Sequence, residues 1–126
     1  MLIADDFGLG RKHDSAILSL VEAGRLDGTS VMVNHAIAPA DIARLQAARV
    51  SGAQIGLHLN LTQALPGMSA AWPLSTLLRP FLGADLLEAI RDSLVRQTDE
   101  FASLFGHLPD YYDGHQHCHC FPAIVP

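Results

Sequence analysis

The stretch Gln54-Ile55-Gly56-Leu57-His58-Leu59 is a short, mostly apolar run that ends in polar, ligand-type side chains. Its length and composition predict a buried β-strand. The segment before it, from Pro39 to about Arg49, has apolar residues at helical spacing and begins with a proline, which suits a first helical turn. A helix leading into a strand is one unit of a pattern that the rest of the chain repeats.

Two similar units precede this strand. Residues 2–4 are apolar and are followed by two aspartates and a glycine-rich turn, which predicts a first strand. Residues 14–23 have helical spacing, and Asp14 or Ser15 could serve as the N-cap. Residues 29–33 are rich in β-branched side chains and predict a second strand.

The segments after the third strand are more varied. Residues 65–82 contain three prolines and predict a long loop with short helical turns, whereas residues 84–105 have the apolar pattern of a long amphipathic helix closed by Gly106. Tyr111-Tyr112 predicts a brief fourth strand. It leads into residues 113–120, which, if extended, would present one carboxylate and three imidazoles on the same face: Asp113, His115, His117 and His119.

Alternating strands and helices predict an α/β fold with parallel strands and right-handed crossovers, in an open sheet or in a barrel. Both architectures place functional residues at the carboxyl ends of the strands. Four separate segments supply polar residues to that rim: Asp5 and Asp6, Asn34 and His35, His58 and Asn60, and the stretch that begins at Asp113. Their convergence predicts an active site.

The chain has 126 residues, which fits one domain over residues 1–126. Apolar residues make up 49% of it and charged residues only 17%, which favours contact with another chain, such as a homo-oligomer. The net charge of −5 argues against nucleic acid as a partner. The two closely spaced cysteines, the absence of a signal-peptide pattern and the absence of a long apolar run favour a cytoplasmic protein without a membrane span.

A carboxylate and two imidazoles from separate strand ends can hold one divalent ion and leave positions for water and a substrate oxygen. A second carboxylate beside the ligands could take a proton from that water as a general base. The adjacent residues Asp5 and Asp6 could supply one carboxylate for each of these two roles. The reaction class this favours is metal-assisted hydrolysis.

Each element of this reading has a simpler alternative. Asp5 and Asp6 are of types that often occur in turns or helix caps, and His58 could be a hydrogen-bonded core histidine. The histidine-rich stretch could be a solvated run, although it is too heterogeneous for a tag. The glycines of residues 7–10 lack the third glycine of a dinucleotide fingerprint, and a single Cys-x-Cys is a weak signal for structural zinc.

Taken together, four ordered motifs resemble the YdjC-like carbohydrate deacetylase family, which includes chitooligosaccharide deacetylases and a hopanoid-biosynthesis branch. The motifs cover nearly the whole chain and are Ala4-Asp5-Asp6-Phe7-Gly8-Leu9, Thr29-Ser30-Val31-Met32-Val33-Asn34, Gly56-Leu57-His58-Leu59-Asn60-Leu61-Thr62 and Asp113-Gly114-His115-Gln116-His117-Cys118-His119. The resemblance implies a partial irregular (β/α) barrel of about four parallel strand–helix units. It also implies metal-dependent removal of N-acetyl groups from amino sugars.

Carried over by motif position, the resemblance implies that Asp6, His58 and His115 bind one divalent ion, with magnesium or zinc expected, and that Asp5 is the general base. His117 and His119 are then candidates for a supporting or substrate-side role. Members of the family are longer and carry a histidine general acid in their second half, so this chain is expected to be a truncated member with weak activity. Cys118 stands where an aliphatic residue is usual and is expected to affect packing more than chemistry.

Two other hypotheses remain open at this stage. One is a metal-binding or sugar-binding module without catalysis that self-associates through open barrel edges. The other is a phosphoesterase-like metallohydrolase, which is disfavoured because no basic residue near the motifs could hold a phosphate.

Overall fold

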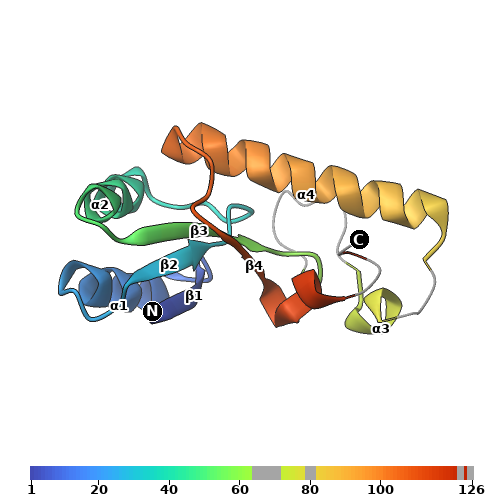
Figure 1. Cartoon of the computed structure of the whole chain (residues 1–126), viewed down its shortest axis with the longest axis horizontal. Helices are drawn as coiled ribbons and strands as arrows, with labels where there is room; N and C mark the ends of the chain where they lie inside the picture. Colours follow the sequence, from blue (N-terminus) through green and yellow to red (C-terminus); the bar gives the residue numbers. More distant parts are fainter. Residues whose placement is uncertain (64–71, 79–81, 122–123, 125–126) are drawn as a thin grey trace.

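The computed structural model describes residues 1–63, 72–78, 82–121 and 124, and these form four parallel strands alternating with helices. The elements in chain order are β1 (Ile3–Phe7), α1 (Arg11–Glu22), β2 (Gly28–Val31), α2 (Pro39–Val50), β3 (Gln54–Leu59), α3 (Leu74–Leu77), α4 (Ala84–Phe105), β4 (Tyr112–Gly114) and the 3-10 helix η1 (His115–Cys120). Figure 1 shows α1 and α2 next to each other and the long α4 running along the molecule. The predicted α/β class is confirmed.

The sheet has the strand order β1-β2-β3-β4, and every neighbouring pair is parallel. Spatial order therefore follows chain order, as it does in the wall of a (β/α) barrel. The sheet is open, because β1 and β4 each pair with one neighbour in the part of the chain that the structure describes. This arrangement agrees with the predicted partial barrel.

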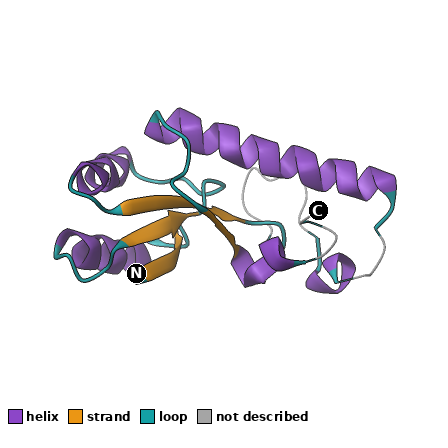
Figure 2. Cartoon of the chain, in the orientation of Figure 1, coloured by secondary structure: helices purple, strands orange, loops and turns teal. Residues whose placement is uncertain are grey.

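The helices α1, α2 and α4 pack against one face of the sheet (Figure 2). Along β3, Ile55, Leu57 and Leu59 are buried in the main apolar cluster, with residues of α1, α2 and α4. Because side chains alternate along a strand, Gly56 and His58 lie on the opposite face. That opposite face corresponds to the inside of a barrel, and it carries the candidate site.

The helices α2 and α4 lie where the apolar spacing predicts them. The helix α4 ends at Gly106, whose φ of 75° is the left-handed conformation that commonly terminates helices. The prediction for α1 is wrong at its start, because the helix begins at Arg11 and Asp14 lies in its first turn. The Asp14 carboxylate instead accepts a hydrogen bond from the backbone N–H of Gly8 at 2.8 Å and braces the turn after β1.

The bounds of three strands also differ from the sequence-based prediction. The strand β1 covers Ile3–Phe7 rather than residues 2–4, so Asp5 and Asp6 lie within the strand and not after it. The strand β2 ends at Val31 rather than at residue 33, and β4 covers Tyr112–Gly114 rather than the two tyrosines. Within the predicted loop of residues 65–82, α3 is a short helix of four residues, while residues 64–71 and 79–81 lie outside the described part. None of the described helices is both long enough and apolar enough to cross a membrane.

Candidate metal centre

Asp5 and Asp6 lie in a β-bulge. Ala4 pairs with Thr29 and Phe7 pairs with Val31, so β1 holds one more residue than β2 between these pairs. Asp6 has a φ of 65°, in the left-handed region that non-glycine residues rarely adopt. In a regular strand the two side chains would point to opposite faces, but a bulge re-aims them. Both carboxylates consequently lie close to His58.

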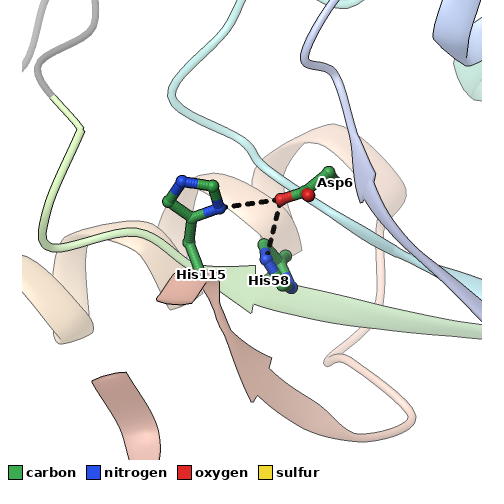
Figure 3. A group of neighbouring side chains, drawn as sticks. All are labelled: Asp6, His58 and His115. Carbon is green, nitrogen blue, oxygen red and sulfur yellow. Dashed lines mark hydrogen bonds and ion pairs between the residues drawn. The ribbon is translucent and has the colours of Figure 1, made fainter. Parts of the chain in front are cut away.

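The carboxylate of Asp6 contacts two imidazole rings (Figure 3). Its Oδ1 atom lies 2.9 Å from Nε2 of His58 and 2.8 Å from Nδ1 of His115. The two rings are edge-on to each other, with centroids 5.8 Å apart. His58 is only 3% exposed, at the end of β3, while Asp6 and His115 are partly exposed. The rim therefore gathers one carboxylate and two imidazoles from three separate segments.

This donor set fits a divalent metal ion. The candidate ligand atoms of Asp6, His58 and His115 all lie within 4.8 Å of one another. Three protein ligands of carboxylate and imidazole type are typical of catalytic zinc sites, which keep a further position open for water or substrate. The same set also admits other divalent ions, so the donors alone do not select one metal.

The second nitrogen of His58 faces a different set of groups. Its Nδ1 atom lies 2.7 Å from Oδ1 of Asp113 and 3.2 Å from Oγ of Ser30. Burial acts to lower the pKa of His58, but the neighbouring carboxylates of Asp113, Asp6 and Asp5 outweigh it and raise the pKa. Burial acts to raise the pKa of Asp113, but hydrogen bonds from His58 and Ser30 lower it.

Asp5 lies at the solvent side of this group. Its carboxylate belongs with His58 and Asp113 to a second cluster whose polar atoms are all within 4.8 Å of one another. Partial burial and the negative charge of Asp113 raise the pKa of Asp5. A carboxylate with a raised pKa is a stronger base, which suits a proton acceptor beside a metal centre.

The extended conformation predicted for residues 113–120 is wrong. Only the first two belong to β4, and the rest form η1, in which Gln116 and His117 have left-handed φ values of 52° and 55°. The three imidazoles therefore do not form a row. Among the described residues, His115 joins a candidate metal group, whereas the rings of His117 and His119 contact each other, with centroids 6.3 Å apart.

Other residues that the sequence places at the rim lie outside the two candidate metal groups. Asn60 is fully buried, and its side chain holds the following loop through the backbone of Thr62 and Gln63. Asn34 and His35 line a separate hollow beside the turn after β1. Cys118 is fully buried in an apolar cluster, in agreement with the packing role expected from its sequence position. Both cysteines are free.

Sequence reasoning assigned no role to Asp113 or Ser30, the two partners of His58. The contact between Asp113 and His58 could have been found from the sheet register, because the two residues are direct partners across β3 and β4. Residues paired in a parallel sheet lie on the same face, so aligning the two polar strand ends would have placed the carboxylate beside the imidazole.

The carboxylate–imidazole cluster lies at the carboxyl ends of parallel strands, where α/β proteins commonly place their functional sites. The chain belongs to the family described as YdjC-like protein, whose sequence model matches residues 1–126.

Individual relatives agree with this assignment. A mouse (Mus musculus) protein named carbohydrate deacetylase is 33% identical over 138 residues, covering 98% of this chain and 44% of the relative. A Serratia marcescens protein named chitooligosaccharide deacetylase is 31% identical over 134 residues, covering 98% of this chain and 51% of the relative. This chain spans about half the length of these curated relatives.

The fold is also found in a solved structure. A crystal structure of an Enterococcus faecalis protein, named for a proposed role in cellobiose-phosphate cleavage, superposes with a TM-score of 0.72 at 21% identity. The alignment covers 94% of this chain and 49% of that chain. It supports the same arrangement of strands and helices.

Proposed function

We propose that this chain carries the metal centre of a carbohydrate deacetylase that removes N-acetyl groups from amino sugars or their oligosaccharides. Asp6, His58 and His115 hold one divalent ion, with magnesium or zinc as the expected metal, and Asp5 is the general base. The observation that carries the proposal is the convergence of two imidazole nitrogens on one carboxylate oxygen of Asp6. The names of the relatives support the substrate class.

The bound ion supplies Lewis-acid polarisation of the acetamide carbonyl and of the attacking water. Asp5 accepts a proton from that water as its oxygen adds to the carbonyl carbon. The carbon–nitrogen bond then breaks, the nitrogen takes up a proton, and acetate and the free amine are released.

The proposal is tested by measuring acetate release from di-N-acetylchitobiose and longer N-acetylated oligosaccharides. We expect acetate to form with added zinc or magnesium, to stop after treatment with a chelator and to return when the metal is restored. Acetate release at the same rate in metal-free and metal-loaded protein would contradict the metal centre. Metal binding without any acetate release would reject the deacetylase function of this chain.

A second candidate is a non-catalytic metal-binding or sugar-binding module that self-associates through its sheet edges. The observation in its favour is an apolar groove of about 320 Å³ between α4 and the strands β3 and β4, lined by Leu59, Leu94, Val95, Thr98, Asp99 and Tyr112. Val95 and Tyr112 are about half exposed there. Sedimentation equilibrium decides this point, because a monomer that releases acetate would exclude the second candidate.

A further inference from the structure

We propose that Asp113 is a positioning residue that fixes the ring orientation and the tautomer of His58. The inference deepens the proposed function, because it concerns how His58 is presented to the ion that Asp6, His58 and His115 would share. Nothing in the motif carry-over assigns Asp113 a role. The structure assigns it one through its contact with His58.

The contact is short and is fixed by the backbone. Oδ1 of Asp113 lies 2.7 Å from Nδ1 of His58. The two residues are register partners on the adjacent parallel strands β3 and β4, so their side chains leave the sheet on the same face. His58 is buried, which leaves its ring little freedom to turn away. The orientation of the imidazole is therefore determined by a partner on a regular strand rather than on a flexible loop.

This geometry also determines which nitrogen can bind a metal. A neutral imidazole has one N–H donor and one lone pair, and an ionised carboxylate only accepts hydrogen bonds. Both ring nitrogens of His58 face a carboxylate, Nδ1 that of Asp113 and Nε2 that of Asp6. With an ion bound between Nε2 and Asp6, the proton of His58 is held on Nδ1, where Asp113 accepts it. The lone pair is left on Nε2, which faces Asp6 at 2.9 Å. Carboxylates that hold ligand histidines in this way commonly tune metal affinity.

The same argument decides between two overlapping groups of candidate ligands. His58 belongs both to the group with Asp6 and His115 and to the group with Asp5 and Asp113. A neutral ring has only one lone pair, so it can serve only one of them. With Nδ1–H directed at Asp113, His58 serves the group of Asp6, and Asp5 is not used as a metal ligand.

Ser30 is the weaker of the two partners at Nδ1. Its Oγ atom lies 3.2 Å from Nδ1, and a hydroxyl group can either donate or accept a hydrogen bond. It therefore supports the ring position without selecting a tautomer. We expect Ser30→Ala to weaken zinc binding less than Asp113→Asn does.

The decisive variant is Asp113→Asn, which keeps the size of the side chain. Its amide can turn its NH₂ group toward Nδ1, which favours the tautomer with the proton on Nε2. We expect the zinc dissociation constant, measured by competition with a chromophoric chelator, to rise by about 10- to 100-fold. Long-range ¹H–¹⁵N spectra of histidine-labelled protein report the His58 tautomer directly, both with zinc and in metal-free protein at a pH where the ring is neutral.

Asp110→Asn is the matched control. Asp110 lies three residues earlier and bonds to Arg49 and to the backbone of Ile55, and no contact with His58 is found among the described residues. It should cost stability without changing the tautomer or the zinc affinity. If Asp113→Asn unfolds, the wild-type spectrum still decides, because a proton on Nε2 of His58 in the zinc-loaded wild type would overturn the inference.

The remaining outcomes are also distinguishable. An Asp113→Asn protein that binds zinc as the wild type does and keeps Nδ1–H would overturn the role of Asp113 while leaving the metal centre intact. A wild-type protein that binds no divalent ion would reject the metal centre itself. The tautomer of His58 in metal-free protein would then test the role of Asp113 separately. A proton on Nδ1 in the wild type that is lost in Asp113→Asn would still show that Asp113 controls the ring.

Discussion

Oδ1 of Asp6 lies 2.8 Å from Nδ1 of His115, although 109 positions separate the two residues in the sequence. Asp6 lies in β1, the first strand of the sheet, and His115 begins η1 directly after β4, the last strand. His58 from β3 also contacts Asp6. No local segment could build this cluster. It depends on parallel strands whose carboxyl ends share one rim, so the proposed chemistry is sensitive to any change that disturbs the sheet.

Asp5→Asn should abolish most acetate release while leaving metal binding intact. The amide is close in size to the carboxylate but cannot accept the proton of the attacking water, so we expect the rate to fall by about 10²- to 10⁴-fold. Acetate release and zinc titration should be measured on the same preparation. Equal rates for the variant and the wild type would remove Asp5 from the mechanism.

Gly56→Ala should destabilise the fold. A Cβ atom at this position would clash with the ring of Tyr111, which packs over the glycine. Displacing the ring should reduce the free energy of unfolding by about 1–3 kcal/mol, as overpacking usually does. Urea denaturation of both proteins measures the difference.

Gly83→Ala is the control for this change, because a Cβ atom there meets nothing within 4 Å and the φ value of −63° suits alanine. We expect little change in its unfolding midpoint. A Gly56→Ala protein as stable as Gly83→Ala would show that Tyr111 does not need the space above Gly56.

The ion pair between Asp110 and Arg49 should make stability depend on acid pH. The pKa of Asp110 is lowered mainly by hydrogen bonds from the Arg49 side chain. A hydrogen bond from the backbone N–H of Ile55 lowers it further. A group whose pKa is lower in the folded state stabilises the fold above its unfolded-state pKa, which is about 3.9 for aspartate. That stability is lost as the pH falls through the folded-state value.

Asp110→Asn should therefore reduce stability at neutral pH by at most about 1 kcal/mol, since the pair is partly exposed to solvent. The difference from the wild type should shrink as the pH is lowered below about 4. Thermal unfolding across this range tests the sign, with Asp92→Asn on the exposed surface of α4 as the control. A difference that grows on acidification would contradict the assignment.

Much of the fold could be predicted from periodicity. The bounds of α4 follow from a long, regular helical spacing of apolar residues. Those of β3 follow from a short, nearly continuous apolar run. The rule that parallel strands share a functional edge places Asp6, His58 and the stretch that begins at Asp113 on one rim. The family resemblance then selects His115 within that stretch. In both cases the sequence pattern and the tertiary structure favour the same local conformation.

The parts that could not be predicted depend on unusual backbone conformations. The left-handed φ of Asp6 turns two consecutive carboxylates toward one site, and nothing in its local sequence requires this conformation. Gln116 and His117 are also left-handed, which ends the strand and separates His115 from the other two imidazoles. Such conformations in non-glycine residues are held by the surrounding structure and cluster at functional sites.

The most direct test of the central claim is a crystal structure of the protein grown with zinc, with anomalous data collected at the zinc edge. We predict a single strong peak at the rim, about 2.0–2.2 Å from an oxygen of Asp6, from Nε2 of His58 and from a ring nitrogen of His115. A peak held by other residues, or a rim without zinc while these three side chains keep their present positions, would contradict the assignment of the metal centre.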